Sequence, residues 1–293
     1  MSPKRQDSHD LKRVRRTMPE LPEVETVRRG LAKAMEGRRI NQVVVRRTDL
    51  RRPLPENFSE ALTGRTITQL ARRAKYLLIH LDDGTVVLAH LGMSGRMVIE
   101  QGTDAEVPAR KHEHIAFAVG NGTVIRFSDP RRFGLMDLST EEGLSTHPLL
   151  ASIGPEPLGD DFNGAMLAAR LKGRKTPIKS ALLDQRIVAG LGNIYVCEGL
   201  FMAGVSPRRS AHTIGPVRAE RLVVETKQVL RDAIEAGGST LRDHVTATGE
   251  MGYFQHNFKV YGREGELCPT CKKPVKRIVQ AGRSTFFCAS CQR

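Results

Sequence analysis

Four cysteines near the end of the chain constrain its fold more than any other feature of the sequence. They are spaced as Cys268-x2-Cys271-x16-Cys288-x2-Cys291. Four thiolates at this spacing can close a tetrahedral metal site with no position left for water, so such a site is structural rather than catalytic. Two disulfides or an iron site are the alternatives, and the spacing of the pairs favours one structural Zn²⁺ ion.

The segment between the two cysteine pairs is predicted to be a basic β-hairpin. The runs "KPVKRIV" and "RSTFFC" indicate two strands, joined by a turn at residues 280–282. A module this small has too little core to fold alone, so the metal would supply its folding energy. Lys276, Arg277 and Arg283 make the hairpin positive, and we expect it to bind a phosphate backbone.

The charge balance indicates a polyanionic partner. The chain has 46 Lys and Arg against 32 Asp and Glu, a formal net charge of +14. Residues 1–17 hold six basic and two acidic side chains, so the other residues still carry +10. A basic globular body favours nucleic acid, with anionic lipid or simple solubility as the alternatives. No run of eighteen apolar residues occurs, so the sequence predicts no membrane span.

The amino terminus and the cysteines indicate a reducing, intracellular compartment. No apolar segment follows the charged amino terminus, so no secretory signal is predicted. A reducing compartment favours a metal over disulfides at the four-cysteine motif. The remaining cysteine, Cys197, lies in the apolar run "NIYVCEGLF", where a small buried side chain fits better than a reactive thiol.

The hydrophobic pattern changes along the chain and indicates separate domains. Residues 1–17 are polar, basic and aperiodic, which is typical of a disordered extension. The segment "LPEVETVRRGLAKAMEG" predicts a helix with one apolar face, with Pro22 in its first turn and Gly37 at its end. Short β-branched or alternating runs from Ile40 to Leu138 predict an antiparallel sandwich or barrel. The stretch "HPLLASIGPEPLGDD" predicts a linker, and helical periodicity follows at Phe162–Leu171, Pro177–Asp184, Asn193–Ala203 and Val217–Ala236.

The segment "GLGNIYVCEGLF" has the pattern of a phosphate site. Two glycines precede Asn193, a good N-cap, and an apolar helix follows. Free N–H groups at such a helix start attract anions, and the glycines allow a close approach. An ordinary loop-to-helix junction explains the segment about as well, and only the basic hairpin favours the phosphate interpretation.

The turn "SDPRRFG", residues 128–134, has side chains suited to insertion into nucleic acid. A guanidinium group can occupy a gap left by a base, and an aromatic ring can enter the base stack. Met93 in "HLGMSG" is either a second inserted side chain or a core methionine at a strand end. Lys75 in "RRAKYLLI" begins an apolar strand, as either a solvated edge lysine or a poised cation.

The chemistry of Pro19, which follows Met18, depends on whether it starts the chain. An internal proline nitrogen is an amide and is not nucleophilic. An N-terminal proline is a secondary amine that can attack a sugar C1′ and form a Schiff base, and a helix N-terminus favours its uncharged form. Glu20 beside it can then move protons. The alternative is that these residues simply begin a helix.

Together these motifs resemble those of the bacterial formamidopyrimidine-DNA glycosylases, repair enzymes that remove 8-oxoguanine. The resemblance runs from Met18 to the carboxyl end. It rests on seven motifs in the expected order: PELPEVE (19–25), RRAKYLL (72–78), HLGMSG (90–95), DPRRFG (129–134), LGNIY (191–195), GYFQ (252–255) and the four-cysteine hairpin.

The resemblance implies an α+β fold in three parts, after a basic disordered extension at residues 1–17. Residues 18–148 would form an N-terminal antiparallel β-sandwich that bears the catalytic helix. Residues 149–264 would form a helix–two-turn–helix domain, and residues 265–293 a zinc-finger β-hairpin. DNA would lie in the basic cleft between the domains.

The resemblance also implies roles for individual residues. Pro19 would be the nucleophile and Glu20 the acid/base residue, while Glu23 would help to hold the terminus in place. Lys75 would contact the phosphate and sugar at the lesion, and Arg283, counted with the catalytic residues, would bind a backbone phosphate. Further contacts to DNA would come from side chains that fill the vacated stack (Met93, Arg131, Phe133), from those that bind phosphates (His112, Lys175, Asn193), and from the loop around Thr246 to Tyr253, which would close over the flipped base.

The implied reaction is base excision followed by strand cleavage. The amine displaces the damaged base, the Schiff base opens the sugar, and β- and δ-eliminations leave a one-nucleotide gap. The implied partner is double-stranded DNA with 8-oxoguanine or a formamidopyrimidine opposite cytosine, and not a membrane. The zinc ion would stay outside the chemistry, and the family implies a monomer in the bacterial cytoplasm.

The chain departs from the family's pattern at two places. Met251 stands where relatives often have proline, which bears on substrate preference, and Pro19 is the nineteenth residue rather than the first. We expect translation to start at Met18, with that methionine then removed; proteolysis of the extension is the other route. The competing functions are an endonuclease VIII-like glycosylase for oxidised pyrimidines and a non-catalytic DNA-binding protein blocked by residues 1–17.

Overall fold

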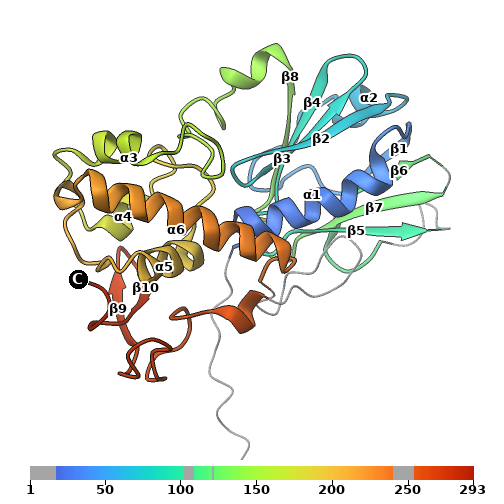
Figure 1. Cartoon of the computed structure of the whole chain (residues 1–293). Coiled ribbons are helices and arrows are strands. Elements are labelled where there is room, and N and C mark those ends of the chain that lie inside the picture. The colour runs from blue at the N-terminus through green and yellow to red at the C-terminus, as the bar shows by residue number, and fades with distance from the viewer. Residues whose placement is uncertain (1–17, 102–108, 121, 240–253) are drawn as a thin grey trace, which may run out of the picture.

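The computed structural model of the protein describes residues 18–101, 109–120, 122–239 and 254–293. Figure 1 shows a body of two sheets beside a body of helices, with a two-stranded hairpin at the carboxyl end. The predicted α+β class, with an antiparallel sandwich before a helical domain and a four-cysteine hairpin, is confirmed. Among the described residues, no helix combines the length and the apolar character needed to cross a membrane.

Each half of the sandwich is a four-stranded antiparallel sheet. One sheet has the strand order β1-β6-β7-β5 and the other β2-β3-β4-β8. Side chains that face inward from both sheets form one core, as expected for alternating strands packed face to face. The strands are β1 (Ile40–Val45), β2 (Ile67–Arg73), β3 (Tyr76–Leu81), β4 (Thr85–His90), β5 (Arg96–Gln101), β6 (Glu113–Val119), β7 (Thr123–Ser128) and β8 (Leu135–Thr140).

Helix α1 (Leu21–Met35) packs against the sandwich and follows the sequence prediction at both ends. Pro22 lies in its first turn, and Gly37 follows it with a φ of +73°, which glycine adopts without strain. The other side of α1 contacts helix α6 (Pro216–Glu235) of the helical domain. The apolar face that contacts the sandwich is buried and consists of Val24, Val27, Leu31 and Met35.

One short helix in the sandwich was not predicted. Helix α2 (Phe58–Leu62) lies between β1 and β2 and buries both of its terminal side chains in the core. The ring of Phe58 meets that of Phe117 in β6 edge to face, with centroids 6.4 Å apart. A helix of five residues is too short to give a helical period in the sequence.

In the described part of the carboxyl-terminal half, the α-helices are α3, α4, α5 and α6. Residues Ile194–Phe201 of helix α5 are all buried, which suits its almost wholly apolar sequence. The predicted helix at Pro177–Asp184 is shorter than expected, because Pro177 precedes the first turn as its cap. The bounds of the helices are α3 (Gly164–Leu171), α4 (Ile178–Leu182) and α5 (Asn193–Met202). The 3-10 turns are η1 (Glu142–Ser145), η2 (Ala211–Thr213) and η3 (Phe254–Asn257).

The hairpin at the carboxyl end packs on α5. Its strands β9 (Lys276–Gln280) and β10 (Arg283–Phe287) pair in an antiparallel register, as predicted. Cys197 and Phe201 of α5 lie in one apolar cluster with Val275 and two of the four cysteines of the hairpin motif. Cys197 is buried, as predicted, and burial raises the pKa of its thiol to about 11, which disfavours the reactive thiolate form.

Candidate active site and nucleic-acid interface

Glu20 lies buried where the start of α1 meets the start of α5. Its carboxylate accepts the N–H of Ile194 at 2.9 Å and that of Tyr195 at 3.4 Å. Burial raises the pKa of Glu20 to about 7, against the opposite effect of the nearby Lys75 ammonium. A carboxyl group with such a pKa is protonated in about half of the molecules at neutral pH, so it can both give and take a proton.

The helix start that receives Glu20 differs from the sequence prediction. The N-cap of α5 is Gly192, not Asn193, which is the first helical residue. Two N–H groups at this helix start, which the sequence suggested for a phosphate, instead bind the carboxylate of Glu20. The side chain of Asn193 donates from Nδ2 to the carbonyl of Ser284 in β10, at 2.9 Å. Asn193 therefore links α5 to the hairpin.

Gly192 is required for the close approach of Glu20. A Cβ atom added at Gly192 would lie 2.2 Å from the carboxyl carbon of Glu20, far inside van der Waals contact. We expect Gly192→Ala to destabilise the fold by about 1–3 kcal/mol and to slow base excision, because the carboxylate must leave its position. Thermal unfolding and single-turnover excision rates measure the two effects.

Gly215→Ala is the matched control for this substitution. Gly215 is the N-cap of α6, also has a negative φ, and an added Cβ there meets no atom within 4 Å. Its replacement is expected to leave both measurements nearly unchanged. Equal effects of the two alanine substitutions would contradict the steric account of Gly192.

Glu23 connects three segments at the same place. Its Oε2 accepts the backbone N–H of Glu20 at 2.9 Å. Its Oε1 accepts the hydroxyl of Tyr195 at 2.6 Å, and both the N–H and the hydroxyl of Ser239 at 2.8 Å. Glu23 therefore holds the start of α1 against α5 and against the segment that follows α6, which agrees with a role in fixing the terminus.

Lys75 lies in the turn between β2 and β3, beside Glu20. Burial lowers the pKa of the Lys75 ammonium, the carboxylate of Glu20 acts against this shift, and Arg283 of the hairpin adds to it. These mutual effects place Lys75, Glu20 and Arg283 around one site. Lys75 is half-buried, and its role as a poised cation rather than a solvated edge lysine stays a prediction.

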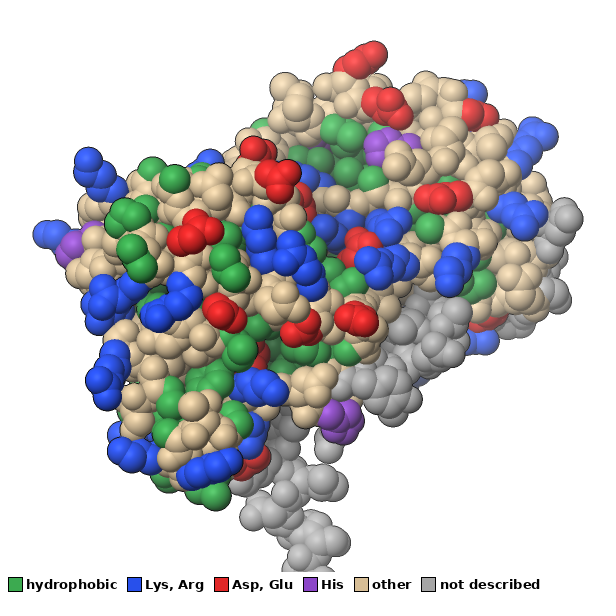
Figure 2. Space-filling view, in the orientation of Figure 1, with side chains coloured by type: hydrophobic (Ala, Val, Ile, Leu, Met, Phe, Trp, Pro, Cys, Tyr) green, Lys and Arg blue, Asp and Glu red, His purple; other side chains and the backbone are tan. Residues whose placement is uncertain are grey.

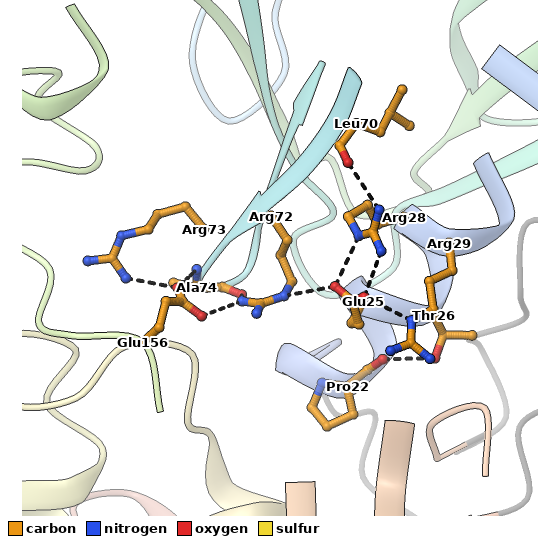
Figure 3. Close-up of polar contacts among 10 residues, drawn as sticks. All are labelled: Pro22, Glu25, Thr26, Arg28, Arg29, Leu70, Arg72, Arg73, Ala74 and Glu156. Atoms are coloured by element: carbon orange, nitrogen blue, oxygen red, sulfur yellow. Dashed lines mark hydrogen bonds and ion pairs between the residues drawn. The ribbon is translucent and has the colours of Figure 1, made fainter. Parts of the chain in front are cut away.

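A network of ion pairs fixes the turn that carries Lys75 (Figure 3). Glu156, in the segment between the two bodies, accepts from Arg72 at 2.7 Å, from Arg73 at 2.8 Å and from the N–H of Ala74 at 2.5 Å. Arg72 also pairs with Glu25 of α1 at 3.2 Å. Burial alone would raise the pKa of Glu156, but its arginine partners outweigh this effect and lower it. The network therefore ties the Lys75 turn to α1 and to the start of the helical domain.

The side chains predicted to enter the base stack lie on two turns in contact. Phe133 is 43% exposed, and the Arg131 guanidinium lies over its ring, 4.7 Å from the centroid. Met93 is partly buried. A Cβ added at Gly92 would lie 2.3 Å from the backbone carbon of Phe133, so the two turns touch through their backbones. The prediction that these side chains act together remains open to test, and their position allows it.

The remaining predicted DNA contacts are distributed more widely. His112 is exposed, with a φ of +65°, next to the turn of Arg131. Lys175 is exposed in the segment between α3 and α4. Thr246 and Tyr253 lie outside the described residues. Figure 2 shows Lys and Arg side chains gathered at the junction of the two bodies and over the edge near the hairpin.

The four cysteines of the hairpin form a cluster suited to one metal ion. Their sulfur atoms all lie within 4.8 Å of one another, with Cys271 and Cys288 3.4 Å apart and Cys268 and Cys291 3.9 Å apart. Tetrahedral coordination with metal–sulfur bonds of about 2.3 Å needs sulfur atoms about 3.8 Å apart. The distances fit this geometry, so the site can hold a structural metal ion of the zinc type.

Lys179 was not predicted from the sequence. It is fully buried in α4, and its ammonium donates to Thr285 Oγ1 at 2.7 Å and to the carbonyl of Ser284 at 3.0 Å. It therefore holds the hairpin against the helical domain. A lysine in the run "TPIKSALL" gave no local signal of this contact, which joins residues 106 positions apart.

Three family profiles match the chain in order. The formamidopyrimidine-DNA glycosylase N-terminal domain matches residues 18–136, and the formamidopyrimidine-DNA glycosylase H2TH domain matches residues 153–245. A zinc finger found in FPG and IleRS matches residues 265–293. The three matched ranges correspond, in order, to the sandwich, the helical domain and the carboxyl-terminal hairpin.

Full-length relatives and solved structures are similar to the chain. The formamidopyrimidine-DNA glycosylase of Cereibacter sphaeroides is 58% identical over 284 residues, with 94% of this chain and 100% of that protein covered. The enzyme of Azorhizobium caulinodans is 56% identical over 296 residues, with the same coverage. A variant of Lactococcus lactis FPG bound to Fapy-dG-containing DNA has a TM-score of 0.86 at 35% identity, covering 94% of this chain and 100% of that one. MutM from Thermus thermophilus has a TM-score of 0.82 at 40% identity, covering 94% and 98%.

The sandwich and the helical domain meet at a buried carboxyl group with a raised pKa, beside a basic four-cysteine hairpin, and the matched family profiles and relatives assign this arrangement to the DNA glycosylases of DNA repair. More narrowly, the chain belongs to the formamidopyrimidine-DNA glycosylase family, which confirms the predicted resemblance.

Proposed function

We propose that this protein is a bifunctional glycosylase and abasic-site lyase for oxidised purines, 8-oxoguanine and formamidopyrimidines, in double-stranded DNA. The observation that carries the proposal is the buried carboxyl group of Glu20, with a pKa near 7, directly after Pro19 and beside Lys75. A group of this kind protonates a leaving group or sugar oxygen and then takes the proton back. The protein acts as a monomer, in the cytoplasm of a bacterium.

The covalent step uses the nitrogen of Pro19 as the nucleophile. The amine attacks C1′ of the damaged nucleotide, the glycosidic bond breaks with its electron pair leaving on the base, and the new ammonium nitrogen gives up its proton, which balances the charge on the departing base. The freed nitrogen electron pair then expels O4′, which takes a proton from Glu20, so the C1′–O4′ bond breaks and the iminium Schiff base forms. β-Elimination breaks the 3′ phosphate bond and δ-elimination breaks the 5′ one, which leaves a one-nucleotide gap.

This chemistry requires Pro19 to be a free amine. In a peptide bond to Met18 its nitrogen is an amide with no nucleophilic electron pair. The residues before Pro19 must therefore be absent from the active enzyme, either because translation starts at Met18 and the methionine is removed, or because the extension is cleaved. The family match, which begins at residue 18, supports this assignment.

The DNA contacts follow the distribution of basic and exposed side chains. Met93, Arg131 and Phe133 fill the gap left by the flipped base, and Arg131 faces the opposite cytosine. Lys75, His112, Lys175, Asn193 and Arg283 bind phosphates, and the loop around Thr246 to Tyr253 covers the flipped base. Support comes from two neighbours of similar fold, which are complexes with DNA containing Fapy-dG and carbocyclic 8-oxo-G. We place the domain boundaries at residues 18–148, 149–264 and 265–293.

The metal of the hairpin is one Zn²⁺ ion held by the four thiolates of Cys268, Cys271, Cys288 and Cys291. Four protein ligands leave no position for water or substrate, so the ion stabilises the hairpin and takes no part in the chemistry. The hairpin in turn carries Arg283 toward Lys75, which places a second positive charge at the site.

Cleavage of defined duplexes tests the proposal. The chain that begins at Pro19 is expected to nick an 8-oxoguanine:cytosine duplex faster than a thymine glycol duplex of the same sequence. Faster cleavage of thymine glycol would indicate the endonuclease VIII-like function instead. Tight binding without cleavage, from a chain with a free Pro19, would indicate a non-catalytic DNA-binding protein.

A further inference from the structure

We propose that Asp129, through Ser94, is a positioning residue that makes the turns carrying Met93, Arg131 and His112 act as one unit on DNA. The inference rests on the proposed function, in which these side chains replace the flipped base and hold the backbone. Asp129 touches no DNA itself in this account. Its side chain is fully buried behind the three turns.

The carboxylate of Asp129 organises the turn of Arg131 and Phe133. Oδ2 accepts the N–H of Gly134 at 2.7 Å, and Oδ1 accepts the N–H of Arg131 at 3.3 Å. Hydrogen bonds from backbone N–H groups to a buried carboxylate are stronger than those between neutral groups. They hold the turn so that Phe133 remains exposed and Arg131 lies over its ring.

Ser94 joins this turn to the turn of Met93. Its hydroxyl donates to Asp129 Oδ1 at 2.5 Å and accepts the N–H of Arg131 at 3.2 Å. Ser94 follows Met93 directly, so a movement of the methionine strains both hydrogen bonds. The close backbone contact of Gly92 with Phe133 adds a second connection between the same two turns.

The backbone of Asp129 holds the third turn. Its N–H donates to the carbonyl of His112 at 3.0 Å, and its carbonyl accepts from Arg132 at 3.2 Å and from His114 Nε2 at 2.8 Å. His112 and Arg132 both have positive φ, +65° and +57°. Such conformations are unfavourable for residues other than glycine and persist where surrounding contacts impose them. The backbone of each residue is hydrogen-bonded to the backbone of Asp129: the carbonyl of His112 accepts from it, and the N–H of Arg132 donates to it.

The physical consequence is a coupling between side chains that do not bond to each other. If Met93 and Phe133 enter the stack on a shared support, removal of either one disturbs the other, and their effects on binding do not add. If the hydrogen bonds of Ser94 are removed, only the backbone contact of Gly92 with Phe133 still joins the two turns, so the coupling between the two side chains weakens. Double-substitution cycles measure this difference directly.

The test uses the metal-loaded chain that begins at Pro19 and a duplex with a non-cleavable abasic-site analogue opposite cytosine. Dissociation constants are measured for Met93→Ala, Phe133→Ala and the double variant, with Ser94 present and again with Ser94→Ala. With Ser94 present, we expect the combined loss of affinity to differ from the product of the single losses by about fivefold or more. With Ser94→Ala we expect the difference to fall below about twofold.

Opposite-base selectivity gives a second readout that a general loss of stability does not change. Ser94→Ala is expected to reduce the preference for cytosine over adenine opposite the lesion, because the backbone N–H of Arg131 loses the Ser94 hydroxyl as an acceptor. Asp129→Ala should reduce it further, and Asp129→Asn should restore part of it, since the amide oxygen still accepts from Gly134. Ser139→Ala is the control. The Ser139 hydroxyl donates only locally, to the carbonyl of Thr140 on β8, so its removal should change neither readout.

The outcomes separate the inference from the proposed function. If Met93→Ala and Phe133→Ala each leave lesion binding unchanged, the proposed role of these residues in the stack is wrong. If each weakens binding but their effects multiply with Ser94 present, only the coupling through Asp129 is wrong. If Asp129→Ala does not fold, the Ser94→Ala cycle still decides, because it removes a single hydroxyl group.

Discussion

Replacement of Glu20 by glutamine, in the chain that begins at Pro19, is expected to slow base excision by about 10²–10⁴-fold. Glutamine keeps the size of the side chain and one acceptor for the N–H groups of Ile194 and Tyr195, but it carries no exchangeable acid proton. Single-turnover excision of 8-oxoguanine measures the effect. Glu60→Gln, an exposed residue of α2, is the control. Excision by the glutamine protein within about threefold of the parent rate would contradict the acid/base role.

The same substitution has an effect on stability with a defined pH dependence. The pKa of Glu20 rises from 4.5 to about 7 on folding, so the native state holds this proton more tightly than the unfolded state. Stability from this group is present below pH 4.5 and is lost as the pH rises through 7. Between pH 4 and pH 8, the difference in unfolding free energy is expected to shift by about 3 kcal/mol in favour of the glutamine protein. Denaturant unfolding at both pH values measures this shift, and a pH-independent difference would contradict the raised pKa.

Loss of one metal ligand is expected to abolish tight DNA binding. Cys268→Ser removes a thiolate, and because the metal supplies the folding energy of the hairpin, β9 and β10 should lose their structure. Arg283 then leaves the site, together with the contacts that Asn193 and Lys179 make to β10. We expect affinity for lesion DNA at fixed salt to fall by about 10²-fold.

Metal content and fluorescence anisotropy with labelled duplex check this result. The matched control is Cys197→Ala, a buried thiol of α5 that lies outside the four-cysteine cluster. It should keep one metal ion for each chain and nearly the parent affinity. A Cys268→Ser protein that retains both the metal and the affinity would contradict the structural role of the hairpin.

Features that depend on local patterns could be predicted from the sequence. Alternating β-branched residues indicated the strands of the sandwich, and the apolar face of Val24 and Leu31 indicated α1. The spacing of the cysteine pairs indicated a metal cluster, because two ligands separated by two residues can turn toward one ion. Each of these signals lies within one short segment of chain.

Features that join distant segments could not be predicted. The cap of α5 was assigned to Asn193 because asparagine is a good local acceptor, but the acceptor in the structure is Glu20, 174 residues away from Ile194. The same limit applies to the ion pair between Glu156 and Arg73, which lie 83 positions apart in the sequence. Charged residues are frequent in both segments, and nothing in the local sequence says which of them meet.

The direct test of the account is reductive trapping with borohydride on abasic-site DNA, followed by mapping of the cross-linked residue. The chain that begins at Pro19 is expected to give a covalent adduct at the nitrogen of Pro19. The chain that begins at Met1 with residues 1–18 intact is expected to give none, and to gain the activity when those residues are removed. Efficient trapping by a chain with an intact Met1 terminus, or a cross-link mapped to Lys75, would contradict the assignment of Pro19 as the nucleophile.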